Sequence, residues 1–243
     1  LGYVLVALVL TVVTVWGLIQ YGVPALAKHV AHALPSSVDA ALGQESLEIM
    51  DQTLFSPSQL SEQRQRELRT AFAKMTQNVL DGHDWQFELR SSKPVGPNAF
   101  ALPSGIVVLT DELVLLAKED QEIVAVLAHE MGHVVHRHAL RRLLQDSVVV
   151  LLIAAVTGDV TAITSLAATI PVVLVEAKYS RDFEREADHF ALQYLRQHDI
   201  APKHFAAILL RMEKESPDGD AMHDYLSTHP ATRERVKIFQ EEG

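Results

Sequence analysis

The first 27 residues carry no charged side chain, and this feature limits most strongly what the chain can fold into. The run LGYVLVALVLTVVTVWGLIQYGVPALA extends from Leu1 to Ala27. About 20 consecutive apolar residues form a helix long enough to cross the hydrocarbon core of a bilayer. Trp16 and Tyr21 belong to the residue types that lie at membrane–water interfaces. We therefore expect a single transmembrane helix over residues 1–27.

Two other structures could explain this apolar run. A cleaved signal peptide has a shorter apolar core of about 7–15 residues, and a buried core helix would be the second alternative. Lys28 is the only cationic residue between the run and a long acidic stretch. Positive charge is enriched on the cytoplasmic side of membrane proteins, so the following domain is expected on the other side.

The composition excludes several classes of protein. The formal net charge of −10 disfavours a nucleic-acid partner. The chain contains no Cys, which rules out disulfides, thiolate zinc sites and a cysteine nucleophile. Any metal must therefore be bound by histidines and carboxylates. Nothing in the sequence indicates the oligomeric state.

The 243 residues are enough for a connector and a sizeable folded domain. Residues 28–56 are interrupted by Pro35 and two serines, and we expect them to form a juxtamembrane connector. Residues 57–243 are expected to form the folded domain.

Hydrophobic patterns divide this domain into helices and short strands. A helical period runs from Leu60 to Val79, behind a Ser-Pro start. Alternation predicts a strand over 85–92, and 98–110 is typical of two short strands around a Pro-Ser-Gly turn. A short helix capped by Thr110 follows.

The second half of the domain is predicted to be helical. One helix begins near Asp120 and runs to about Gln145. Residues 147–175 are apolar and are divided by a Gly-Asp pair into two pieces, each too short to span a membrane comfortably. We expect them to form a helical hairpin that packs on the core or contacts lipid. A further amphipathic helix is predicted over 180–198, and a final helical hairpin is interrupted around Pro217.

The stretch VLAHEMGHVVHRH, residues 126–138, contains a metal-site pattern. Residues four apart lie on one face of a helix, so His129 and His133 point to the same spot. Glu130 lies beside them, where it could take a proton from a water held by the metal. This is the H-E-x-x-H arrangement of zinc peptidases, in which the metal lowers the pKa of that water.

Three fixed positions match by chance in many sequences, and a polar helix rich in His is the alternative. Two features of the context favour the metal site. Gly132 lies mid-helix, where glycine costs about 1 kcal/mol relative to Ala, and this indicates close approach of another backbone or of substrate. The preceding EIVAVLA is apolar enough to be buried.

A catalytic zinc site needs a third protein ligand. The extended pattern H-E-x-x-H-x-x-G-x-x-H is excluded, because the sequence has His136 and Ala139 at the required Gly and His positions. We expect His136 to lie behind the ligands at most, and His138 to face solvent.

Two carboxylates on the later helix are better candidates for completing the site. Glu184 and Asp188 are four residues apart and share a helical face. One of them can bind the metal, and the other can accept the second N–H of a ligand histidine. A solvated ion-pair face is the alternative, and we expect Arg185 and Glu186 to belong to such a face.

Four separated motifs give the chain a specific resemblance. NAFALPSG, VLAHEMGH, YSRDFEREAD and STHPATRERV occur in this order, and the sequence resembles the HtpX / CAAX-prenyl-protease / BepA family of membrane-associated zinc peptidases over about residues 50–240. The resemblance implies a mostly helical α+β fold, a zincin-like metallopeptidase domain with a small sheet. It implies one Zn²⁺ per chain on His129, His133 and Glu184, with Glu130 as catalytic base and Asp188 behind the ligands.

The other two motifs carry further implications of the resemblance. Asn98, Ala99, Phe100 and Ala101 would form an edge strand that binds an extended substrate by strand addition. His229 matches a histidine that lies over the metal in relatives, where it would stabilise the oxyanion or close the open coordination site. Arg235 matches a structural arginine.

The departures from the family narrow the expected function. One clear span argues against the multi-span prenyl proteases, and we expect no C-terminal helical-repeat domain. We expect a stand-alone, single-span zinc endopeptidase that hydrolyses unfolded or misassembled envelope or membrane proteins. We expect it in a bacterial inner membrane, with the peptidase domain in the periplasm.

Two alternatives to this enzyme remain. One is a latent, chaperone-like assembly factor whose zinc site His229 closes, with the apolar segment 147–175 as a client-binding surface. The other is a purely structural zinc site with four protein ligands.

Overall fold

The computed structural model describes residues 2–77, 79, 83–157, 179–215, 225, 229 and 233–241. The chain divides into two compact units. The first contains the described parts of Leu1–Pro35 and Leu140–Ile170, and the second those of Ser36–Ala139 and Pro171–Gly243.

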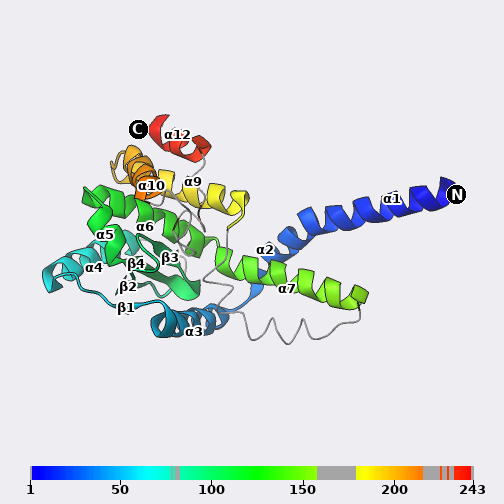
Figure 1. The fold of residues 1–243 in the computed structure, drawn as a ribbon, viewed down its shortest axis with the longest axis horizontal. Coiled ribbons are helices and arrows are strands. Elements are labelled where there is room, and N and C mark those ends of the chain that lie inside the picture. Colours follow the sequence, from blue (N-terminus) through cyan, green and yellow to red (C-terminus); the bar gives the residue numbers. More distant parts are fainter. Residues whose placement is uncertain are drawn as a thin grey trace. The chain divides into compact units, whose positions relative to one another are not determined.

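The first unit begins with one uninterrupted helical run (Figure 1). It comprises α1 (Gly2–Gly17), a π-helical turn η1 (Leu18–Gly22) and α2 (Val23–Ala33). Within the described residues this run, Gly2–Ala33, is the one helix whose length and composition would allow it to cross a membrane. The side chains of α1 are exposed apart from the partly buried Gly17, as expected for a surface that lipid would cover.

The second unit contains a four-stranded mixed sheet. The strands are β1 (Ser56–Pro57), β2 (Gln86–Ser91), β3 (Ala99–Ala101) and β4 (Ile106–Thr110), in the order β1-β2-β4-β3. Strands β2 and β4 are parallel, and the other two pairs are antiparallel. The strands predicted over 85–92 and 98–110 are therefore confirmed. β1 lies where the sequence suggested a helix start, and the helix begins only at Glu62, capped by Ser61.

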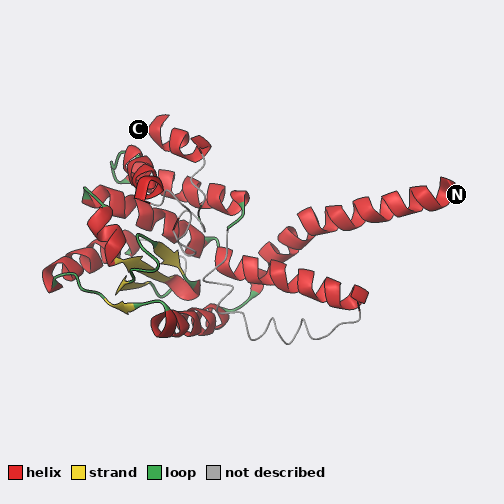
Figure 2. Cartoon of the chain, viewed as in Figure 1, coloured by secondary structure: helices red, strands yellow, loops and turns green. Residues whose placement is uncertain are grey.

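Helices surround this sheet (Figure 2). They are α3 (Ser36–Thr53), α4 (Glu62–Thr76), α5 (Asp111–Leu116), α6 (Asp120–Val135), α9 (Arg181–Gln197), α10 (Lys203–Glu215) and α12 (Arg233–Glu241). The Thr110 hydroxyl caps α5 by accepting from the Leu113 N–H, as predicted. One core cluster joins side chains of α4, α6, α9, α10 and α12 to the sheet. The predicted mostly helical α+β fold with a small sheet is confirmed.

The expected connector over 28–56 is largely helical. It contains the end of α2 and the whole of α3, and Leu47 and Met50 of α3 share a core cluster with Phe100 and Val108. Gly43 permits this packing, because a β-carbon there would collide with the backbone of the turn between β3 and β4. Helix α3 is therefore part of the folded unit, although the sequence suggested a spacer.

The helix predicted from Asp120 to Gln145 is broken in two. Helix α6 ends at Val135, and α7 runs from His138 to Thr157. Arg137 adopts a left-handed conformation with φ of 52° and forms an ion pair with Asp39 of α3. This ion pair stabilises the chain at the break. Local periodicity could not reveal it, because Asp39 lies far away in the sequence. The predicted apolar hairpin is described only as far as Thr157, and Pro217 also lies outside the described residues.

Candidate metal centre

Helices α6 and α9 pack with their backbones unusually close. A β-carbon added at Gly132 of α6 would lie 2.9 Å from the Cα of Ala187 and 3.1 Å from the Cβ of Phe190, both on α9. Real β-carbons do not approach other atoms so closely, so only glycine fits without a shift. The predicted close approach at Gly132 is therefore that of the α9 backbone, and it brings the faces of the two helices together.

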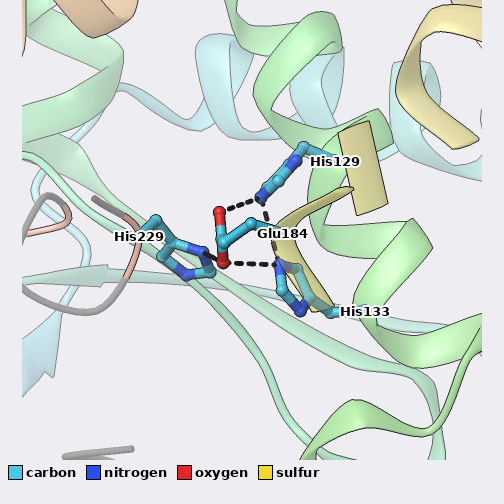
Figure 3. A group of neighbouring side chains, drawn as sticks. All are labelled: His129, His133, Glu184 and His229. Atoms are coloured by element: carbon cyan, nitrogen blue, oxygen red, sulfur yellow. Dashed lines mark hydrogen bonds and ion pairs between the residues drawn. The ribbon is translucent and has the colours of Figure 1, made fainter. Parts of the chain in front are cut away.

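Four side chains from separate parts of the chain meet at this contact (Figure 3). They are His129 and His133 of α6, Glu184 in the first turn of α9, and His229 after α10, and one donor atom from each lies within 4.8 Å of the others. The Nε2 atoms of His129 and His133 are 3.0 Å apart, and the two oxygens of Glu184 lie 3.5 Å from them, Oε2 from His129 and Oε1 from His133. All four side chains are buried.

These distances suit a bound divalent metal. Zinc bonds of about 2.0–2.2 Å in a tetrahedral site place neighbouring donor atoms roughly 3.3 Å apart. The observed separations of 3.0 and 3.5 Å lie on either side of that value. Two imidazoles and one carboxylate are also a donor set that zinc prefers. His129, His133 and Glu184 could therefore hold the metal, as predicted from the sequence.

Asp188 and Arg235 support this cluster from behind. Asp188 Oδ1 lies 3.0 Å from Nδ1 of His129, the ring nitrogen that points away from the cluster. Arg235 donates to both oxygens of Asp188, at 2.7 and 2.8 Å, and lies 2.6 Å from Glu184. A ligand histidine oriented by a carboxylate is the usual arrangement behind a metal. The geometry thus suits the supporting role predicted for Asp188.

Glu130 differs from every other carboxylate of the site. Its side chain is fully buried, and neither of its oxygens forms a hydrogen bond of good geometry among the described residues, although the Tyr225 hydroxyl lies close enough to lower its pKa. His229 Nε2 lies 3.8 Å from Glu130 Oε1. Burial raises the pKa of Glu130, although the nearby positive charge of His229 and His129 opposes that rise. A buried carboxyl with a raised pKa and free lone pairs can accept a proton from water.

The other titratable groups shift in both directions. Burial would lower the pKa of His129, but Asp188 and Glu184 outweigh it and raise that pKa to about 9. Burial lowers the pKa of His133 well below its usual value despite Glu184. Burial would raise the pKa of Glu184, but His229 and His129 hold that pKa well below its usual range. A metal on His129 must therefore displace a proton near neutral pH, so metal binding should weaken in acid.

Two tyrosines of the site escaped the sequence analysis. The Tyr179 ring stacks on His133 with centroids 4.1 Å apart, and the Tyr225 ring stacks on His229 at 4.5 Å. Burial raises the pKa of both hydroxyls, so they remain protonated at neutral pH. Tyr179 directly precedes the Ser180 cap, and Tyr225 lies four residues before His229. Both lie near motif residues in the sequence, but neither has a spacing typical of a metal ligand.

His138 and Glu186 do not lie where they were expected. His138 was predicted to face solvent, but it is fully buried, with Nδ1 only 2.9 Å from Nδ1 of His133. Glu186 was assigned to a solvated face, but its Oε2 lies 2.9 Å from His138 Nε2. Arg185 is exposed and pairs with Asp182, as expected.

The helix break at Arg137 explains why the prediction for His138 was wrong, because that prediction assumed an unbroken helix. His136 caps α6 and does not reach the donor cluster.

The predicted substrate strand forms one edge of the sheet in the strand order. β3 packs against α6 and pairs with β4 on its other side. The Asn98 N–H donates to the Thr110 hydroxyl, and the Thr110 N–H donates to the Asn98 carbonyl, so both main-chain groups of Asn98 are used within the sheet. Main-chain groups alternate in direction along an antiparallel strand. The N–H and carbonyl of Phe100 therefore point to β4, and those of Ala99 and Ala101 point to the outer edge. The Asn98 side chain accepts the Ala99 N–H at 2.7 Å. Substrate pairing remains a prediction, now centred on the Ala99 carbonyl and on Ala101.

Comparison with known proteins agrees with this geometry. The mitochondrial metalloendopeptidase OMA1 of Arabidopsis thaliana is 31% identical over 160 residues, which cover 66% of this chain and 32% of the relative. The metalloprotease LoiP of Escherichia coli is 29% identical over 177 residues, covering 71% and 68%. The beta-barrel assembly-enhancing protease of E. coli is 25% identical over 152 residues, covering 57% and 31%.

The chain spans about a third to about a half of the length of its plant and yeast mitochondrial relatives. The model of peptidase family M48 matches residues 62–242, which include α6, α9 and all four donor residues. Because this match covers more than half of the chain, the protein belongs to peptidase family M48.

Proposed function

We propose that this protein is a membrane-anchored zinc endopeptidase that hydrolyses peptide bonds of unfolded or misassembled proteins. The observation that carries the proposal is the buried cluster of His129, His133 and Glu184, with the Glu130 carboxylate beside it and without a hydrogen bond of good geometry among the described residues. A structural site has no use for a buried carboxylate that is so poorly satisfied, because such a group destabilises the fold. A hydrolase needs one as a base.

In the proposed mechanism, His129, His133 and Glu184 hold the metal, and Glu130 moves the proton. When bound, the metal would supply a Lewis acid that lowers the pKa of water and polarises the scissile carbonyl. Glu130 takes a proton from the attacking water while the oxygen of that water bonds to the carbonyl carbon. The same carboxyl then gives that proton to the leaving nitrogen as the C–N bond breaks. Its raised pKa suits both transfers.

His229 is proposed to act on the carbonyl oxygen. It lies within reach of both Glu184, at 3.0 Å, and Glu130, at 3.8 Å. A ring N–H at this place could donate to the oxyanion that develops during attack. The main-chain N–H of His229 donates to the Tyr225 carbonyl at 2.7 Å, and the Tyr225 ring holds the imidazole by stacking on it.

The substrate class follows from the edge strand and the membrane helix. Pairing through the Ala99 carbonyl and the main chain of Ala101 would select extended segments with little regard for sequence, and unfolded proteins provide them. The names of the relatives agree with protein substrates, since one is a beta-barrel assembly-enhancing protease. The apolar run Gly2–Ala33 would keep the enzyme at the membrane. We propose the bacterial inner membrane, in keeping with the relatives from E. coli. We propose the periplasmic side for the peptidase domain, because little positive charge follows the apolar run.

A latent, chaperone-like protein is the second candidate. The observation in its favour is that His229 belongs to the donor cluster, so four protein ligands could close the site. In that case the edge strand would hold clients without cutting them.

The decisive experiment is cleavage of casein by the purified full chain in detergent, with zinc, beside the Glu130→Gln variant. We expect the wild type alone to cleave and both proteins to bind one zinc per chain. Equal cleavage by both would show that Glu130 is not the base. Zinc binding without cleavage in either would favour the latent protein, and His229→Ala should then release activity.

A further inference from the structure

We propose that His138 and Glu186 form a relay that positions the ligand His133 from outside the metal site. The inference rests on the proposed metal site and adds two residues to it. The relay runs Glu186–His138–His133, and its two contacts are both 2.9 Å long. Neither residue contributes a donor atom to the cluster, so their role is one of positioning.

The helix break creates this contact. On an unbroken helix, residue 138 would lie about 140° around the axis from His133 and would face away from it. The left-handed conformation of Arg137 ends α6 and restarts the chain as α7. The His138 ring then packs face to face on Phe183 of α9, with centroids 4.4 Å apart and an angle of 8° between the planes. Stacking fixes the ring, and burial keeps water from competing for its nitrogens.

Only one placement of protons satisfies both contacts with neutral imidazoles. His133 Nε2 faces the donor cluster, so a neutral His133 carries its proton on Nδ1. That N–H must donate to His138 Nδ1, which then carries its own proton on Nε2. The Nε2–H of His138 donates to Glu186. Each ring is thereby held in one tautomer, with a carboxylate at the end of the chain.

Both α6 ligands are thus tied to carboxylates, but differently. His129 contacts Asp188 directly, and Arg235 locks that carboxylate in a buried ion pair. His133 reaches its carboxylate through an intervening ring, and the Glu186 side chain is 29% exposed. Carboxylates that hold ligand histidines orient the ring and make it a better donor, and losing such a partner typically costs 10–100-fold in metal affinity.

The test is the zinc dissociation constant of the full chain, measured by competition with a fluorescent chelator. His138→Phe keeps the stacked ring but removes both nitrogens, and we expect about 10–100-fold weaker binding. In His138→Asn an amide oxygen takes the place of Nδ1 and can accept from His133, so binding should recover most of that loss. Glu186→Ala should weaken binding about tenfold. Arg185→Ala, on the exposed neighbouring residue, is the matched control and should bind as the wild type does.

A second readout separates positioning from packing. With Co²⁺ in place of zinc, the visible d–d bands should shift in His138→Phe and return towards the wild-type spectrum in His138→Asn. Equal zinc affinity in wild type and His138→Phe would overturn the relay. Equal losses in the Phe and Asn variants would do the same, because only packing would then matter. If His138→Phe does not fold, Glu186→Ala and His138→Asn still decide the question. A wild type that binds no zinc would overturn the metal site itself and the relay with it.

Discussion

Helix α6 buries two glutamates two turns apart, and the protein treats them in opposite ways. Glu122 near its start accepts two hydrogen bonds from Arg211, at 2.7 and 2.8 Å, and one from the Lys118 N–H, at 2.7 Å. Burial acts to raise the Glu122 pKa, but these partners outweigh it and hold that pKa below its usual range. Glu130 has no cation bonded to it and no hydrogen bond of good geometry among the described residues, and burial raises its pKa more than the Tyr225 hydroxyl and the nearby histidines lower it.

The difference indicates that Glu122 serves the stability of the fold and that Glu130, on the same helix, serves the proposed reaction. A buried charge with all its partners holds elements together, here α6 to α10. A buried carboxylate whose lone pairs are left open costs stability and is useful only for a reaction. The comparison therefore predicts that equivalent changes at the two positions will affect different properties.

The largest expected effect is on catalysis at Glu130. Glu130→Gln should lower the rate of casein cleavage about 10³-fold, because a general base contributes about 10²–10⁴-fold. Glu122→Gln makes the same chemical change on the same helix and should leave the rate at 25 °C within about twofold, as expected for a group that does not contact the reacting atoms. Initial rates at matched zinc occupancy check this. Similar losses in both variants would mean that Glu130 acts through the fold.

The next effect is on the free energy of unfolding at Arg211. Arg211→Ala leaves the Glu122 carboxylate buried without its cation, which should cost about 3 kcal/mol. The exposed pair Arg66–Glu62 provides the control, and Arg66→Ala should change stability by less than about 0.5 kcal/mol. Urea unfolding of the metal-free protein in detergent measures both. Equal values would show that the Glu122–Arg211 pair is as weak as a surface pair.

A smaller loss in stability is expected from Gly132→Ala, which lies between His129 and His133 on α6. The added methyl must push α9 away, and overpacking of this kind costs about 1–3 kcal/mol, partly offset by the better helix propensity of Ala. Because Glu184 lies on α9, zinc affinity should fall as well. Gly17→Ala is the control, since a β-carbon there meets nothing within 4 Å. Unchanged zinc affinity in Gly132→Ala would show that α9 can shift without moving Glu184.

The smallest effects are on pH dependence in the metal-free protein. Because the folded Glu122 pKa is depressed, its stabilisation is present above the unfolded value near 4.5 and is lost as the pH falls through the folded pKa. Glu130 has a raised folded pKa, so its contribution is fully present below about 4.5 and is lost as the pH rises through the folded pKa.

Urea unfolding across pH 3–8 separates these contributions. The stability deficit of Glu122→Gln should shrink in acid, whereas Glu130→Gln should become more stable relative to the wild type as the pH rises. Parallel pH profiles for all three proteins would contradict the opposite shifts.

Features that depend on residues close together in the chain could be predicted from the sequence. The Thr110 cap, β2, the β3–β4 turn and the convergence of His129 with His133 follow from spacing along one element. The pairing of Glu184 with that face followed from a second helical spacing and a family motif. The mostly helical fold with a small sheet was accessible in the same way.

The errors concern features set by distant partners. At the helix break Arg137 forms an ion pair with Asp39, nearly a hundred residues earlier in the chain, and no periodicity within 120–145 indicates this break. The burial of His138 followed from that break. Similarly, α3 looked like a spacer because its packing surface depends on one glycine against the β3–β4 turn.

The donor cluster draws on three segments, and Glu184 and His229 alone are 45 residues apart. A metal held there binds only the folded chain, so each tenfold rise in free zinc above the dissociation constant should add about 1.4 kcal/mol to folding. A copy that loses its metal becomes easier to unfold, and an unfolded copy is itself the kind of polypeptide proposed as substrate. Zinc supply would then set the lifetime of the enzyme population, because loaded copies would digest those that had been emptied.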